Sequence, residues 1–240
     1  MRTLLCIVLL AFAPYVGAAE PEPEEAAPDG EISYELSADR LEYQFQEEGG
    51  ILLWDIEARA GRGKNSLIVE TEGERSVEDD VFEEIEVELL YGRLIASGWE
   101  VQLGVQHDFE PDPERSFAVF GVEGEVPYGV EVEISASFSD DGDGFGSLEI
   151  EHDLALARNL ILYSRFETGL ALQEVEEYET GQGISDITLG VRLGYALSSV
   201  FAPYVGFTWT RALGETADLV EDAGGDEESS AVVAGFKIEL

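Results

Sequence analysis

Apolar and polar side chains alternate with a period of two residues along most of the chain. The segment VEVEISASFS, residues 130–139, shows the pattern without interruption, and from Ile32 onward it recurs in segment after segment. A period of two is that of a β-strand, in which successive side chains point to opposite faces of a sheet. No stretch has a convincing helical periodicity. In the best helix candidate, residues 82–94, three alternating Glu residues would scatter around a helix.

Twelve segments carry this alternation and are predicted to be strands. They cover residues 36–46, 51–59, 66–73, 82–94, 99–108, 116–125, 130–139, 145–156, 160–173, 184–197, 203–213 and 229–240. Most have about the ten residues that a tilted strand needs to cross a bilayer. The sequence therefore predicts an all-β fold.

The connections between these segments alternate in chemistry. One set is short and nearly free of acidic residues: 61–65, 96–98, 126–129, 157–159 and 198–202. The other set is acidic and mostly longer: 47–50, 74–83, 110–115, 140–144, 174–183 and 214–228. Odd and even connections of an up-and-down antiparallel sheet lie at opposite ends of the sheet. The two ends of this sheet are therefore predicted to differ in chemistry.

Short turns at one end, longer loops at the other and an even number of strands are typical of barrels of the bacterial outer membrane. Aromatic residues expected at strand ends, where interfacial girdles form, are Trp54, Trp99, Trp209, Tyr91, Tyr195 and Phe201. We predict that residues 31–240 form a closed up-and-down antiparallel transmembrane β-barrel of about 12 strands in the cell outer membrane. The alternative is a soluble β-sandwich or lipocalin-like barrel, whose apolar face points inward.

The first thirty residues differ from the rest in composition. Residues 1–19 have a positive start, an apolar stretch and small residues at the end, and are predicted to be a signal peptide. Residues 20–30, EPEPEEAAPDG, are predicted to be a disordered acidic tail because they contain too little apolar surface to fold. Cys6 and Met1 both lie in the predicted signal peptide, so the processed chain would contain no sulfur.

The chain of 240 residues has 52 acidic and 13 basic side chains, a formal net charge of −39. Such a charge repels polyphosphate and excludes nucleic acid as a partner. Adaptation to high salt, where excess charge keeps a surface hydrated, is the explanation that we favour for this acidity. Weak collection of divalent cations by the outer loops is the alternative.

The same alternation places many charges on the inner face of the predicted barrel. Seven glutamates are expected to face the lumen: Glu84, Glu86, Glu88, Glu131, Glu133, Glu149 and Glu151. Their candidate partners are Arg59, Arg165 and Arg192. A charge that pointed into lipid would cost several kcal/mol near the midplane. A narrow cation-preferring passage and a packed charged plug both fit this pattern.

One loop carries the candidate metal ligands. His107, Asp108, Glu110 and Asp112 combine an imidazole with carboxylates, a set that could hold Cu²⁺. A solvated histidine at the base of a loop is the simpler explanation of His107, and the one that we favour. The acidic segments 140–143 and 174–179 are further places for weak cation binding. No Gly-x-Ser-x-Gly context selects a nucleophile, so we expect no enzymatic activity.

An ordered series of motifs identifies a resemblance. They are Asp39-Arg40-Leu41-Glu42-Tyr43, Trp54-Asp55-Ile56-Glu57-Ala58, Leu90-Tyr91-Gly92-Arg93, Gly183-Ile184-Ser185-Asp186, Phe201-Ala202-Pro203-Tyr204-Val205-Gly206 and Trp209-Thr210-Arg211. Over residues 38–240 the chain resembles the copper resistance protein B family. The resemblance implies an outer-membrane barrel of copper tolerance that binds or passes copper ions at the cell surface.

The resemblance also implies partners, and the residues bear on which copper ion is concerned. The expected partners are outer-membrane lipid, lipopolysaccharide and copper or other divalent cations; protein partners are unknown. Members of the family often carry a Met- and His-rich segment before the barrel, where this chain has residues 20–30. Because oxygen-rich sites select hard or borderline ions, we expect weak binding of Cu²⁺ in preference to Cu⁺. A structural or passive cation-preferring porin without a copper role is the alternative function.

Overall fold

The structure, a computed structural model, describes residues 31–46 and 49–240. The predicted signal peptide, residues 1–19, and the predicted acidic tail, residues 20–30, lie outside the described residues. Within the described part of the chain, no helix has the length and apolarity to cross a membrane.

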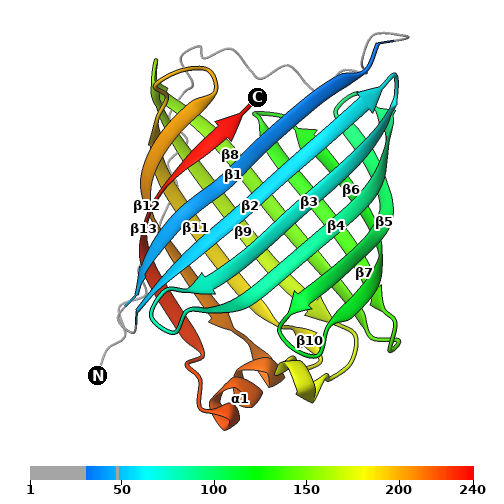
Figure 1. Cartoon of the computed structure of the whole chain (residues 1–240), viewed down its shortest axis with the longest axis vertical. Coiled ribbons are helices and arrows are strands. Elements are labelled where there is room, and N and C mark those ends of the chain that lie inside the picture. Colours follow the sequence, from blue (N-terminus) through cyan, green and yellow to red (C-terminus); the bar gives the residue numbers. More distant parts are fainter. Residues whose placement is uncertain (1–30, 47–48) are drawn as a thin grey trace.

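Across the described residues, twelve long antiparallel strands form one closed sheet (Figure 1). They are β1 (Ser33–Gln46), β2 (Gly49–Arg62), β3 (Asn65–Ser76), β4 (Val81–Ala96), β5 (Trp99–Glu110), β6 (Arg115–Val126), β7 (Val130–Ser139), β8 (Gly144–Ala157), β9 (Leu160–Ala171), β11 (Asp186–Tyr195), β12 (Phe201–Ala212) and β13 (Glu228–Glu239). The short strand β10 (Gly183–Ile184) pairs with the end of β9. Each long strand pairs with its neighbours in the chain, and β13 pairs with β1, so that Leu41 lies opposite Phe236. The predicted twelve-stranded barrel is confirmed.

The alternation along each strand separates an apolar exterior from a polar interior. On β5 and β6 the large apolar side chains Leu103, Val105 and Phe120 are exposed on the outside. The charged side chains Arg40 and Glu42 of β1 are buried inside. An apolar outer surface around a polar lumen is the arrangement of a transmembrane barrel and the reverse of a soluble sandwich. This distribution decides between the two folds that the sequence left open.

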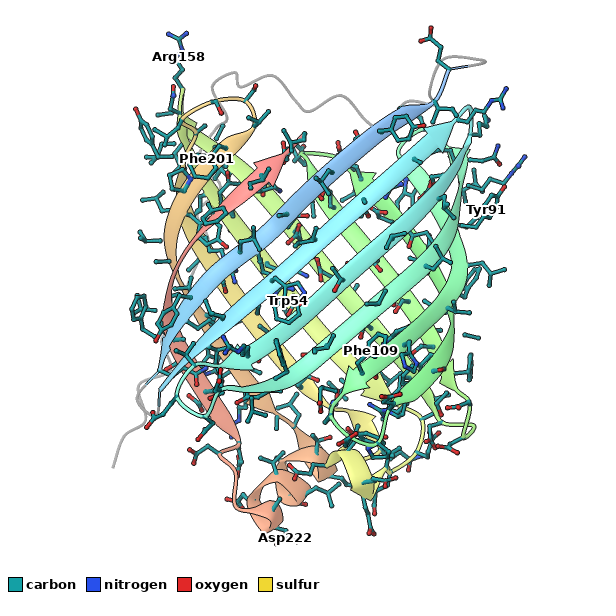
Figure 2. The ribbon with its side chains drawn as sticks, viewed as in Figure 1. Trp54, Tyr91, Phe109, Arg158, Phe201 and Asp222 are labelled. Carbon is teal, nitrogen blue, oxygen red and sulfur yellow. The ribbon has the colours of Figure 1, made fainter. Side chains whose placement is uncertain are left out.

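The aromatic side chains only partly follow the predicted girdles. Figure 2 shows Tyr91 and Phe201 toward the end of the barrel with the short turns, and Phe109 toward the opposite end. Trp54, which we expected near a strand end, lies near mid-height on the barrel wall. That expectation was wrong because β2 begins at Gly49 and continues to Arg62, so Trp54 is an interior residue of the strand.

The acidic end of the barrel contains helical structure that the sequence pattern does not predict. Helix α1 (Gly214–Ala223) and the 3₁₀ turn η1 (Glu176–Tyr178) lie at this end, below the strands in Figure 1. The helix has no apolar stripe to reveal it, because its one buried residue is Thr216. Tertiary contacts hold it: the backbone N–H of Gly181 donates to Thr216 Oγ1 at 2.9 Å. Gly224, at a φ of 91°, ends it in the left-handed conformation that favours glycine.

One part of the inner wall is apolar. Ile68, Leu90, Phe117 and Val119 form a buried cluster inside the barrel. In the register of the sheet, Gly104 lies between Leu90 and Val119. A Cβ atom at Gly104 would come within 2.7 Å of Leu90 Cδ2, so glycine is what allows this cluster to close. The lumen is therefore narrowed on this side by packed side chains, and a second buried apolar cluster, Tyr204, Ala231 and Val233, lies on the inner wall at β12 and β13.

A pair of adjacent residues on β5 tests the assignment of the two faces. Val105→Arg places a charge on the outer surface near the middle of the strand and should lower the free energy of unfolding by about 2–4 kcal/mol. Gln106→Arg is the matched control, because Gln106 Nε2 already lies 2.6 Å from Glu86 Oε2 and 2.9 Å from Asp108 Oδ1. Urea unfolding of the barrel in lipid vesicles measures the free energy of unfolding of both variants. Equal losses for the two variants would contradict the assignment.

Candidate functional site

The structure places His107 on the outer face of β5. Its Nδ1 lies 2.9 Å from Ser116 Oγ, and its Nε2 lies 3.6 Å from Glu114 Oε2. The imidazole also meets the ring of Phe109 edge to face, with the centroids 4.4 Å apart. These contacts agree with the simpler explanation of His107, a histidine at the base of a loop.

The other predicted ligands are not gathered around His107. Asp108 points into the barrel, because successive residues of a strand alternate between faces. There its carboxylate accepts a hydrogen bond from Gln106 Nε2 at 2.9 Å and lies 3.4 Å from Arg115 Nη2. Glu110 ends β5, and Asp112 lies in the loop that follows. Among the residues that the structure describes, no group of three or more His, Cys, Asp and Glu side chains has the geometry to hold a metal ion.

The acidic loops are tied to one another at the rim of the barrel. Segment 140–143 is a tight hairpin in which the backbone N–H of Ser139 donates to the carbonyl oxygen of Asp143 at 2.8 Å. Gln173 Nε2 donates to Asp143 Oδ1 at 3.0 Å. Tyr178 Oη donates to the carbonyl oxygen of Pro113 at 2.7 Å, which joins segment 174–179 to the loop after β5. The rim is therefore an ordered structure made by three loops.

Inside the barrel is a cavity of about 470 Å³ with a strongly acidic wall. Fourteen Asp or Glu side chains, from β1 to β4, β6 to β9 and β11, line it together with one basic side chain, Arg165. Six of the seven glutamates predicted to face the lumen are among them, and the seventh, Glu84, lines a second cavity. The predicted lumenal face is confirmed.

Many of these carboxylates stand directly opposite one another on neighbouring strands. Glu57 of β2 is paired in register with Glu70 of β3, which is paired in turn with Glu88 of β4. Within the described residues, neither Glu70 nor Glu88 forms an ion pair with a basic side chain. Like charges directly opposite in a sheet are destabilising. This row of carboxylates therefore favours cations that enter the lumen.

The predicted arginine partners all pair with carboxylates inside the barrel. Arg59 Nη1 lies 2.8 Å from Glu100 Oε1, and Arg165 contacts carboxylates on β2, β8 and β9. Arg192 meets Glu42 through two hydrogen bonds, Nε to Oε2 at 2.7 Å and Nη2 to Oε1 at 2.8 Å. Charge-assisted, two-point contacts of this kind are the strongest hydrogen bonds in proteins.

Two further lumenal residues, Arg40 and Asp55, are absent from the set predicted from the sequence. They contact each other, with Nε and Oδ2 3.1 Å apart, and both are buried. Both lie at inward positions of their strands, next to the outward-facing Leu41 and Trp54. That alternation is the signal that could have placed them in the lumen. Their partners on β9 could not be found in this way, because those contacts exist only once the barrel is closed.

Comparisons with known proteins agree on one family and one fold. A family model described as "Copper resistance protein B precursor (CopB)" matches residues 32–239. "Copper resistance protein B homolog" of Pseudomonas syringae pv. tomato (strain ATCC BAA-871 / DC3000) is 34% identical over 210 residues, which are 88% of this chain and 71% of the relative. "Copper resistance protein B" of Escherichia coli is 32% identical over 210 residues, 88% of this chain and 70% of the relative.

Solved structures with a similar fold are outer-membrane barrels. The NanC porin has a TM-score of 0.52 and 10% sequence identity, over 87% of this chain and 100% of the porin. Outer membrane phospholipase A from Escherichia coli has a TM-score of 0.50 and 15% identity, over 90% of this chain and 93% of the phospholipase. At these identities the likeness concerns the fold alone.

The contact between Arg192 and Glu42 can be tested by its contribution to stability. Glu42→Gln removes the negative charge opposite a buried guanidinium and should lower the free energy of unfolding by about 3–5 kcal/mol, the usual effect of breaking a buried ion pair. Glu227→Gln is the control. Because Glu227 pairs with the half-exposed Arg211, this substitution should lower the free energy of unfolding by less than about 1 kcal/mol. Urea unfolding in lipid vesicles compares the free energies of unfolding of the two variants. A loss for Glu42→Gln no larger than for the control would show that the pair is not effectively buried.

Proposed function

The chain belongs to the copper resistance protein B family, and from this premise we propose that it serves copper tolerance in the outer membrane. In this proposal it holds or passes Cu²⁺ in its lumen and is not an enzyme. The observation that supports the proposal is the wall of the acidic cavity of about 470 Å³, which is lined by fourteen carboxylates and one arginine. Copper is then a cargo that visits the lumen, not a resident cofactor.

The donor atoms in the lumen favour one oxidation state of copper. Cu⁺ prefers thiolate and thioether sulfur, and residues 31–240 contain neither Cys nor Met. Carboxylate oxygens suit harder or borderline ions, among which Cu²⁺ binds more strongly than other divalent ions of the first transition row. Carboxylates that remain wet and screened hold such ions weakly. Weak binding suits passage, because an ion that enters must also leave.

The difference between the two ends of the barrel indicates its orientation in the membrane. Outer-membrane barrels place short turns on the periplasmic side and longer loops outside. The acidic rim, with α1 and η1, would then face the cell exterior, where cations arrive. Clefts lined by one sign of charge raise the local concentration of the opposite ion. Outer-membrane lipid and lipopolysaccharide would surround the apolar belt and the rim.

Growth on metals tests the copper assignment in cells. Deletion of the gene should lower tolerance to copper and leave tolerance to zinc unchanged, and expression of the intact chain should restore growth on copper. Equal copper tolerance with and without the protein would favour a passive porin.

Calorimetric titration of the refolded barrel with Cu²⁺ tests where the ion is held. Glu70→Gln combined with Glu88→Gln should reduce the number of bound Cu²⁺ ions, because it removes the unpaired carboxylates of the lumen. The comparison variant combines Asp108→Asn, Glu110→Gln and Asp112→Asn, and should have the smaller effect. Abolition of binding by this second variant alone would assign the site to the end of β5 and the loop that follows it. Cu⁺ binding at about nanomolar affinity under reducing conditions would contradict the proposed oxidation state.

A further inference from the structure

Two arginines join opposite walls of the barrel. Arg165 of β9 places its Nη1 3.2 Å from Oδ2 of Asp55 on β2. Around the closed sheet β9 and β2 are five strands apart by way of β11, β12, β13 and β1, and seven strands apart the other way. In a ring of twelve strands the greatest separation is six. This single ion pair therefore crosses nearly the full width of the lumen.

A second arginine strengthens the same connection. Arg40 of β1 places its Nη1 3.4 Å from Oε1 of Glu167 on β9 and its Nε 3.1 Å from Oδ2 of Asp55. Asp55 thus receives both guanidinium groups, and Glu167 also contacts Arg165. We call Arg40, Asp55, Arg165 and Glu167 the crossbar. The side chains of Arg40 and Arg165 are only 8% and 13% exposed, so the crossbar is held within the barrel.

The crossbar lies between two cavities. The first is the acidic cavity of about 470 Å³, whose wall includes residues of β1 to β9 and β11. The second, of about 480 Å³, is lined by residues of β1 to β4, β9 and β11 to β13, with Thr188, Thr208 and Thr210 in its wall. Arg165 and Glu167 line both cavities, together with Glu72 and Asp186. They therefore form the partition between two chambers of one lumen.

The crossbar also places positive charge where cations would pass. A guanidinium keeps its proton at every pH that a cell meets, so this charge is permanent. Its planar fork bonds two carboxylates at once and gives up little entropy in doing so. An arginine across a pore acts as an electrostatic barrier to cations. Acidic chambers that attract cations are thus separated by a group in which two arginines balance the charges of Asp55 and Glu167, so the group attracts cations less than the chambers do.

We propose that Arg40 and Arg165 are the residues that determine passage through the lumen, because the crossbar closes it and divides it into two chambers. The inference concerns the same lumen as the proposed function and rests on that proposal only for the identity of the cargo. Cations are collected in the chambers and cross only when the bonds of Asp55 and Glu167 to the arginines are released. The crossbar is a specificity-determining element, and copper is one of the cations to which it would apply.

Conductance in planar lipid bilayers tests the crossbar with KCl as the probe. The intact barrel should show a small conductance, and the double variant Arg40→Gln with Arg165→Gln should increase it several-fold. In a KCl gradient the reversal potential of the double variant should shift further toward that of K⁺, because the crossbar then keeps its carboxylates without their arginines. Arg115→Gln is the matched control, since Arg115 also faces the lumen but pairs with Asp108 on the neighbouring strand. Its conductance should equal that of the intact barrel.

A second variant keeps the test decisive if the double variant does not fold. Asp55→Asn breaks the bond of Arg165 across the lumen and leaves Arg165 paired with Glu149 and Glu151, and Arg40 paired with Glu167. Its conductance should lie between those of the intact barrel and the double variant. A large conductance of the intact barrel, or a folded Asp55→Asn barrel that conducts no better than the intact one, would overturn the proposal. Unchanged copper tolerance on gene deletion would remove the copper cargo and leave the conductance result standing.

Discussion

The exclusion of charge from the outer surface of the barrel governs the rest of this structure. A sheet in hydrocarbon must close so that every backbone N–H and C=O finds a partner, and its outward side chains must be apolar. Because side chains on a strand alternate, half of each strand must then face inward. In a chain with 52 acidic residues, the inner face receives many of the charges that the outer face cannot hold.

The interior has too few basic residues to neutralise these charges. Two compact buried ion pairs lie inside the barrel: Arg192 of β11 with Glu42 of β1, and Arg59 of β2 with Glu100 of β5. Such pairs leave a surplus of carboxylates, including the row through Glu70 and Glu88. A surplus of fixed negative charge in a confined space attracts mobile cations. The surplus of carboxylates in the lumen thus follows from the same imbalance that sets the net charge of the whole chain.

The arginines that cross the lumen divide this acidic interior into two chambers. The crossbar connects walls that are five strands apart, so it stabilises the cross-section of the barrel as well as blocking it. At the outer end, the contacts of Tyr178 with Pro113 and of Gln173 with Asp143 hold the acidic loops in place. The rim is thus fixed by contacts between loops, and the lumen is divided by contacts between opposite walls.

The sequence by itself determined the number of strands, their alternation and the chemical difference between the two ends. These features are local: a period of two shows in any ten residues, and a Gly-containing turn or an acidic loop is visible where it occurs. The inward positions of Glu86 and Glu133, and of Arg165, followed from the same period. Helix α1 did not, because contacts of Thr216 and Glu215 with residues over thirty positions away hold it in place of an apolar stripe.

Only the tertiary structure decided which charges meet. Asp55 and Arg165 are 110 residues apart, and no local pattern relates them until β13 pairs with β1 and closes the ring. Closure likewise brings Arg40 to Glu167, 127 residues away. The predicted loop site shows the opposite case, since neighbours in sequence such as His107 and Asp108 are separated by the sheet that lies between them. Period and composition fix which face a side chain occupies, whereas the distance across a barrel depends on every strand in it.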